Sequence, residues 1–156
     1  MVSKIKAAVH ARKAPDFMII ARTDARAVHD FNDAIDRAIA YEKAGADIIF
    51  FEAPQSIEEM KEIHKYIKAP TLANMVEKGK TPMLTGKELY DIGYKIVIYP
   101  VSSLYAVTKS ILDMLKVIKE TETTKFVIDK MIPFDNFNEM ISLDKLRNLE
   151  KELSGK

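Results

Sequence analysis

Residues 17–24 read Phe-Met-Ile-Ile-Ala-Arg-Thr-Asp, an apolar run that ends in three polar residues. The pattern recurs three more times, and stretches with apolar residues three and four positions apart separate the runs. The later runs are Asp47–Phe51 before Glu52, Thr71–Ala73 before Asn74, and Lys95–Tyr99 before Pro100 and Ser102-Ser103. Repeated strand-then-helix units predict an α/β fold with parallel strands, where ligands bind at the carboxyl ends.

The number of units predicts which part of such a fold the chain forms. A closed parallel barrel of this type needs eight strands, whereas this chain offers four. Four strands leave two edges with unpaired backbone groups and an uncovered apolar face. We therefore expect half of a (β/α)8 barrel, completed by oligomerisation or by a partner chain. Residues 1–156 would form a single partial-barrel domain, with the β/α units in 1–103 and a long helix plus C-terminal helices in 104–156.

Local patterns predict where individual helices begin and end. Ser56 with Glu59, and Thr85 with Glu88, have the spacing of capping boxes, in which each residue satisfies a free amide of the other. Gly45 and Gly93 are expected at helix C-termini. His64 is expected on the outer, solvent-facing side of its helix.

The composition excludes several classes of function. The 156-residue chain has a net charge of +1 and 47% hydrophobic residues, so it can form a core but shows no electrostatic footprint for nucleic acid. It contains no cysteine, which excludes disulfides, thiolate metal ligands and cysteine nucleophiles. No apolar run reaches the roughly 20 residues that span a bilayer, and the N-terminal residues lack a signal-peptide pattern. We expect a cytoplasmic protein without membrane contact.

Arg22 and Glu52 are the strongest candidate site residues. A guanidinium just past a buried strand presents a fork of donors that suits a carboxylate or phosphate, although it could also form an ion pair that joins strand ends. Glu52 occupies the equivalent place one strand later, where it could accept a proton, hold a metal through water or orient Arg22. Neighbouring parallel strands would bring these two side chains to one rim, within contact distance.

Weaker candidates follow the other strands. Asn74 could donate its amide to a carboxylate or enolate oxygen, or it could close the turn after its strand. Asp24 is expected to orient another side chain, and Ser102 and Ser103 could bind an anion or cap the long helix. The last loop contains no glycine, which favours a small carboxylate over a phosphate ligand.

The order and spacing of these motifs resemble the isocitrate lyase/phosphoenolpyruvate mutase superfamily, especially its methylisocitrate lyase and carboxyphosphonoenolpyruvate mutase branch. The matching stretches are Ala21–Ala25, Ala44–Asp47, Phe51–Ala53, Leu72–Met75 and Tyr99-Pro100. The resemblance covers the second half of the family's barrel, its fifth to eighth strands.

The resemblance implies a function and a set of roles. Most members cleave a carbon–carbon bond of a 2-hydroxy di- or tricarboxylate through a Mg²⁺-held enolate, and others act on phosphorus–carbon bonds. Arg22 and Asn74 would bind substrate carboxylates, and Glu52 would lie beside the enolate as the catalytic residue. The helix from Leu104 to Ile118 would be the helix that family members exchange between subunits.

The chain also departs from the family pattern. The family's direct Mg²⁺ ligands and acid cysteine belong to the first half of the barrel, so the resemblance assigns no metal ligand here. Val76, Tyr105 and Phe134 stand where the methylisocitrate branch has a threonine and two arginines, which favours a smaller keto or hydroxy acid.

Two main hypotheses follow from these observations. In the first, the chain is a truncated or split lyase-family member, inactive alone, whose site is completed by a complementary N-terminal half. In the second, it is a non-catalytic, self-associating half-barrel that binds small carboxylates. A third hypothesis, an unrelated phosphate-binding α/β protein, is disfavoured by the glycine-free last loop. Met1 falls within what resembles the family's fourth helix, so we expect a miscalled start or a split gene.

Overall fold

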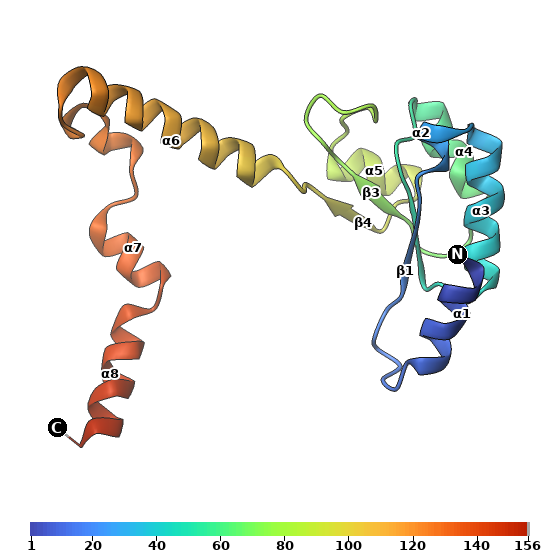
Figure 1. The fold of residues 1–156 in the computed structure, drawn as a ribbon, viewed down its shortest axis with the longest axis horizontal. Coiled ribbons are helices and arrows are strands. Elements are labelled where there is room, and N and C mark those ends of the chain that lie inside the picture. Colours follow the sequence, from blue (N-terminus) through green and yellow to red (C-terminus); the bar gives the residue numbers. More distant parts are fainter. Residues whose placement is uncertain (156) are drawn as a thin grey trace. The chain divides into compact units, whose positions relative to one another are not determined.

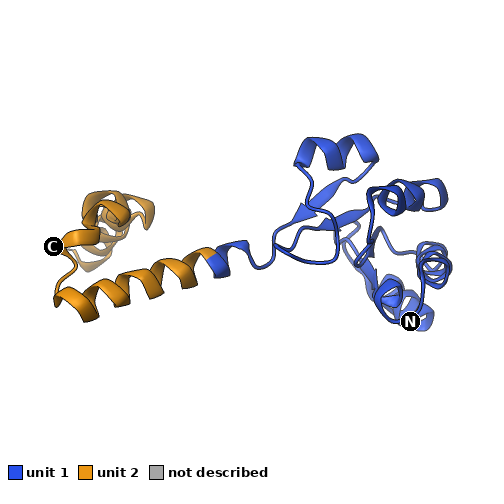
Figure 2. Cartoon of the chain, turned by 90° about the horizontal axis from the view of Figure 1, so that it is seen from above, with its two compact units in different colours: residues 1–105 blue, residues 106–156 orange. Residues whose placement is uncertain are grey.

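The computed structural model describes residues 1–155 and divides into two compact units, Met1–Tyr105 and Ala106–Lys156, coloured separately in Figure 2. The elements of the first unit are α1 (Val2–Ala11), β1 (Ile20–Thr23), α2 (Ala25–Val28), α3 (Phe31–Lys43), β2 (Ile48–Phe51), α4 (Ile57–Tyr66), β3 (Leu72–Asn74), α5 (Gly86–Ile92) and β4 (Ile96–Ile98) (Figure 1). The chain continues with α6 (Ser102–Thr121), the 3₁₀-helix η1 (Lys125–Lys130), α7 (Phe134–Met140) and α8 (Leu143–Ser154).

The strands are parallel and follow one another in chain order. β1 pairs with β2, and β3 pairs with β4, while a parallel bridge between Ile49 and Thr71 links the two pairs. β1, β2 and β4 are each shorter than the apolar run that predicts them. β1 begins at Ile20, although its apolar run begins at Phe17. The amide of Ile19 donates to the Asp47 carboxylate at 2.7 Å, and the same carboxylate accepts the Arg12 guanidinium at 2.6 Å.

Alternate residues of the strands build two separate apolar layers, as the twofold side-chain period of a strand requires. On the helix side, Ile49 and Phe51 pack with residues of α3 and α4, including Ala38 and Ile63. On the opposite face, Ile48, Phe50 and Leu72 are buried together, and Ile96 and Ile98 pack against them half-buried. The second layer therefore lies on the face of the sheet opposite α3 and α4.

The capping pattern at Thr85 is confirmed, and the one at Ser56 is only half formed. Thr85 accepts the Glu88 amide, and the Glu88 carboxylate accepts the Thr85 amide at 2.8 Å. Ser56 accepts the Glu59 amide at 3.1 Å, but the Glu59 carboxylate binds the Arg26 guanidinium at 2.7 Å instead of reaching back to Ser56. The carboxylate binds the guanidinium through both of its oxygens and also accepts the Gln55 amide at 2.8 Å, so its position is set by Arg26 and Gln55.

The prediction that His64 faces solvent is wrong. Its ring is half-buried, with Nδ1 at 2.9 Å from the Met60 carbonyl oxygen and Nε2 at 2.8 Å from Thr71 Oγ1. It also meets the Tyr94 ring edge-on, with centroids 4.7 Å apart. The helical spacing alone put His64 on the outer face of α4, but β3 and the residues after α5 cover that side.

This burial predicts a pH-dependent stability. Burial lowers the pKa of His64, and the charge of Lys95 adds to that effect. Below the ordinary value of about 6.5 the unfolded chain therefore binds more protons at His64 than the folded chain does. We expect stability to fall as the pH drops from about 6.5 towards the folded-state pKa. Urea unfolding at neutral and mildly acid pH should show a smaller acid loss in His64→Gln, and equal losses would contradict this assignment.

α6 begins in the first unit and continues into the second. None of its described residues is buried, and its apolar side chains Leu104, Val107 and Ile111 are each largely exposed. The family resemblance predicts that this helix is exchanged between subunits, which stays a prediction. Within residues 1–155, no helix combines the length and the apolar character needed to cross a membrane.

Candidate carboxylate-binding site

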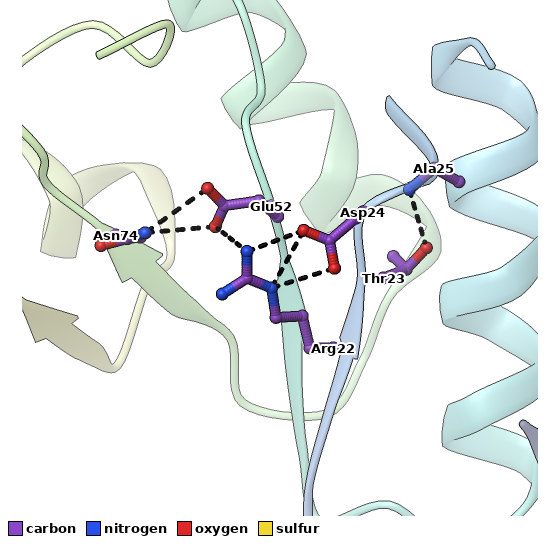
Figure 3. A network of polar contacts seen from close by, with 6 residues as sticks. All are labelled: Arg22, Thr23, Asp24, Ala25, Glu52 and Asn74. Carbon is purple, nitrogen blue, oxygen red and sulfur yellow. Dashed lines mark hydrogen bonds and ion pairs between the residues drawn. The ribbon is translucent and has the colours of Figure 1, made fainter. Parts of the chain in front are cut away.

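Three strand ends bring polar side chains to one rim of the sheet (Figure 3). Arg22 lies in β1, Glu52 directly follows β2, and Asn74 is the last residue of β3. The Glu52 carboxylate lies 3.7 Å from Nη2 of Arg22, and it accepts Nδ2 of Asn74 at 3.2 Å. The parallel register therefore places the three main sequence candidates in a single network.

Arg22 is held from two further directions. Asp24 accepts its Nε at 3.0 Å and its Nη2 at 2.7 Å, so a carboxylate two residues along the chain fixes the fork. The guanidinium carbon lies 4.7 Å from the centre of the Phe50 ring, whose residue is the β2 partner of Arg22. Such a cation–π contact orients the planar group. The Asp24 hydrogen bonds, and after them the charge of Glu52, raise the pKa of Arg22, which keeps it positively charged.

The prediction that Asp24 orients another side chain agrees with this geometry. Arg22 remains half exposed despite these contacts, with 47% of its side-chain surface accessible. Asp24 occupies the Nε–Nη2 edge of the guanidinium, so a ligand carboxylate would meet the remaining donors of this half-exposed group.

Glu52 is the more enclosed acid of the pair, with 20% of its side chain accessible against 56% for Asp24. Its amide donates to the Thr23 carbonyl at 3.0 Å, which continues the β1–β2 ladder past the end of the strand. The next residue, Ala53, adopts a left-handed φ of 58° that non-glycine residues rarely tolerate. Backbone strain of this kind costs on the order of 1–3 kcal/mol and persists where the surrounding structure enforces it.

Two side-chain oxygens beside the network are buried and lack a hydrogen-bond partner within the described chain: Oδ1 of Asn74 and Oε2 of Glu77. Buried acceptors are normally satisfied, so each of these oxygens is positioned to accept a hydrogen bond from a ligand or water. The other oxygen of Glu77 accepts the hydroxyl of Ser102, which joins the loop after β3 to the start of α6. That contact lowers the pKa of Glu77 and keeps it ionised.

A cavity of about 260 Å³ opens beside these side chains. Asp24, Glu52 and Asn74 line one part of it, and the loop residues Gly79, Lys80 and Thr81 line another. Arg22 is not among the lining residues, and Lys80 supplies a cationic side chain to the wall. The arrangement can bind an anion at Arg22 and can accept a proton at Glu52.

The residues of this chain do not fit a directly bound Mg²⁺. Both oxygens of Glu52 contact the Asn74 amide, and one of them lies 3.7 Å from the Arg22 guanidinium, whose positive charge opposes a metal cation on the same carboxylate. Within residues 1–155, no group of three or more His, Cys, Asp or Glu residues could hold a metal ion. The described residues of this chain therefore provide no direct metal-binding site.

Of the weaker candidates, Ser102 and Ser103 lie outside the Arg22 network. α6 starts at Ser102, so Ser102 belongs to the first helical turn instead of the cap position, and its hydroxyl contacts Glu77. Ser103 is exposed in the same turn. Sequence reasoning missed Glu77 as a partner of Ser102, and it missed Lys80. The Gly79-Lys80-Thr81-Pro82 turn was the available signal, because a glycine–proline loop after a strand end is a common place for ligand contacts.

The parallel α/β unit with charged side chains at its strand ends places the chain in the class of α/β proteins, which bind ligands at the carboxyl ends of their strands. Comparison with known proteins identifies the family within this class. The sequence model of the family described as phosphoenolpyruvate phosphomutase matches residues 1–119. This chain belongs to that family.

Curated relatives of the chain include two lyases. It is 51% identical over 150 residues to "2,3-dimethylmalate lyase" of Eubacterium barkeri, which covers 96% of this chain and 52% of that protein. It is 46% identical over 156 residues to "2-methylisocitrate lyase" of Aeropyrum pernix, with 100% and 50% covered. The chain thus spans about half the length of these relatives.

Comparison with solved structures leads to the same family assignment. The crystal structure of 2,3-dimethylmalate lyase, a member of the PEP mutase/isocitrate lyase superfamily, superimposes with a TM-score of 0.87 at 28% identity. That match covers 97% of this chain and 54% of the crystal structure's chain. A phosphonopyruvate hydrolase complex with oxalate and Mg²⁺ matches with a TM-score of 0.83 at 26% identity, covering 96% and 53%. The superfamily assignment made from the sequence motifs is confirmed.

Proposed function

We propose that this chain supplies the carboxylate-binding half of a lyase site that acts on a 2-hydroxy di- or tricarboxylate. The observation that carries the proposal is the oriented fork of Arg22 beside Glu52 and Asn74 at one rim. Arg22 binds a substrate carboxylate, and Asn74 binds a second polar group of the same molecule. Its unpartnered Oδ1 accepts a substrate hydroxyl, which favours hydroxy acids.

The proposal also covers the barrel to which this chain belongs and the parts of the site that the chain lacks. The four strands form the C-terminal half of a (β/α)8 barrel, and another polypeptide segment completes the rim. Mg²⁺ and the acid that protonates the product belong to that other segment, because the side chains of this chain do not fit the metal. Glu52 stabilises the reacting face of the substrate and is the candidate catalytic residue on this side. The isolated chain binds small acids without turning them over.

The test combines binding and reconstitution. Calorimetry of the chain with oxalate, pyruvate and succinate should show binding that competes among the three acids. Adding the half of the Eubacterium barkeri lyase that this chain does not match, together with Mg²⁺, should release pyruvate or glyoxylate from a 2-hydroxy acid such as 2,3-dimethylmalate. Glu52→Gln should bind the acids but lose this release.

The results distinguish the competing functions. Acid binding without release in any reconstituted mixture would favour the non-catalytic carboxylate binder. Release of a phosphorus-containing product from a carboxyphosphonate, with no cleavage of 2-hydroxy acids, would favour phosphorus–carbon chemistry. No binding of any of the three acids would overturn the proposed role of Arg22.

A further inference from the structure

The loop between β3 and α5 brings a basic residue to the cavity beside Glu52 and Asn74. Lys80 lines this cavity together with Gly79 and Thr81, and it is the only basic residue among the described residues of the wall. The rest of the wall comes from the ends of β1, β2 and β3 and the residues that follow them. The loop therefore starts and ends in elements of this chain, and its place does not depend on an edge of the sheet.

A tight turn fixes the backbone just before Lys80. The Gly79 amide donates to the Val76 carbonyl at 2.9 Å, and Lys78 between them has a left-handed φ of 58°. A Cβ atom on Gly79 would lie 3.0 Å from that carbonyl oxygen and 3.2 Å from the Val76 Cβ, so the close approach favours glycine. The turn therefore sets the direction in which the backbone enters Lys80.

Contacts with two other elements of the first unit hold this turn in place. Just before it, Met75 is buried, and its amide donates to the Ile98 carbonyl of β4 at 2.9 Å. Within it, the Glu77 carboxylate accepts the Ser102 hydroxyl at the start of α6. Lys80 is therefore presented to the cavity from a loop that is anchored to both β4 and α6.

The charges around the cavity leave Lys80 available to a ligand. Asp24 and Glu52 line the wall as acids, but both already contact the Arg22 guanidinium, at 2.7 Å and 3.7 Å. None of the ion pairs found among residues 1–155 includes Lys80. A lysine ammonium carries three donors on a flexible stem, so it can follow a ligand carboxylate without the fixed geometry of a guanidinium.

We infer that Lys80 forms a subsite for the second carboxylate of a 2-hydroxy dicarboxylate and makes the site prefer diacids over monoacids. The inference rests on the proposed function, in which Arg22 binds the first carboxylate, and it adds the residue that selects the substrate class. Asn74, whose Oδ1 lacks a partner within the described chain, lines the same cavity. Recognition of the hydroxyl and of the second carboxylate therefore takes place in one cavity.

Malate and 2-hydroxybutyrate are the matched probes, because they share the same carbon chain and hydroxyl and only malate has a second carboxylate. Calorimetry of the chain with each acid, at one pH and one ionic strength, should show tighter binding of malate. Lys80→Met keeps the length of the side chain and removes its charge. We expect it to raise the dissociation constant roughly 5- to 10-fold for malate and less than about twofold for 2-hydroxybutyrate.

Lys78→Met is the matched control, because Lys78 is an exposed lysine of the same turn and is not among the described residues that line the cavity. It should leave the preference for malate unchanged, which separates a specific contact from the general attraction of an anion to a basic loop. Lys80→Arg, which keeps the charge, should retain most of the preference. Circular dichroism checks that each variant is folded.

The outcomes separate the subsite from the proposed function. Equal affinities for the two acids in the wild type, an unchanged preference in Lys80→Met, or an equal loss in Lys78→Met would each overturn the subsite and leave acid binding at Arg22 in place. Absence of binding of both acids would remove the proposed function and the subsite with it. Arg22→Ala should weaken the binding of both acids, whereas Lys80→Met should weaken that of malate alone.

Discussion

Replacing Arg22 by alanine is expected to weaken the binding of oxalate, pyruvate or succinate more than any other single change at the rim. Hydrogen bonds to charged groups contribute about 1.5–3 kcal/mol, which corresponds to a roughly 10- to 150-fold higher dissociation constant. The fork is oriented by Asp24 and by the Phe50 ring before any ligand arrives, and Lys80 beside the cavity has no planar fork to replace it. Calorimetric titration measures the change.

Three further variants show whether ligand binding depends on the charge of Arg22, on the orientation of its guanidinium, or on the loss of any surface arginine. Arg22→Lys keeps the charge but removes the planar fork, and we expect it to recover little of the affinity. Asp24→Asn removes the charged partner that holds the fork and should weaken binding by less than Arg22→Ala does. Arg37→Ala is the matched control, because Arg37 pairs with Asp33 on the exposed face of α3, away from the rim. Unchanged affinity in a folded Arg22→Ala variant would refute the site.

The rim illustrates what periodicity and position can predict. Side chains that follow neighbouring parallel strands must meet at one edge, so Arg22, Glu52 and Asn74 could be grouped before any coordinates were considered. The grouping needs only the strand order and an approximate register. Errors of a few residues at the strand ends, such as the late start of β1, do not change it.

The contacts that hold the side chains of the site in place could not be predicted from the spacing of apolar residues. The cation–π contact of Arg22 requires the pairing of Arg22 with Phe50, which a one-residue slip would remove. The Glu77–Ser102 contact joins the loop after β3 to the start of α6, two residues that are 25 positions apart in the chain. Arg26 and Glu59 meet across 33 residues, which is why the capping box at Ser56 was predicted in full but forms only in part.

The burial of His64 also depends on a contact that helical periodicity cannot predict. This contact, with Gly93, gives the largest expected effect on stability. Gly93 ends α5 with a φ of 131°, a conformation that L side chains rarely adopt. A Cβ atom added there would lie 2.7 Å from Cδ2 of His64, closer than Cβ atoms in folded proteins approach other heavy atoms. The sequence identifies Gly93 as a helix end, but only the structure shows that it also makes room for a ring from α4.

We therefore expect Gly93→Ala to destabilise the first unit severely. The backbone strain costs on the order of 1–3 kcal/mol, and the displaced ring adds the loss of its hydrogen bonds to Met60 and Thr71. Urea unfolding followed by circular dichroism measures the difference. Gly86→Ala is the matched control, because it lies in the same helix with nothing within 4 Å of the added Cβ, and alanine should stabilise it by up to about 1 kcal/mol. Equal stability of the two variants would show that the close approach of Gly93 to His64 does not constrain the fold.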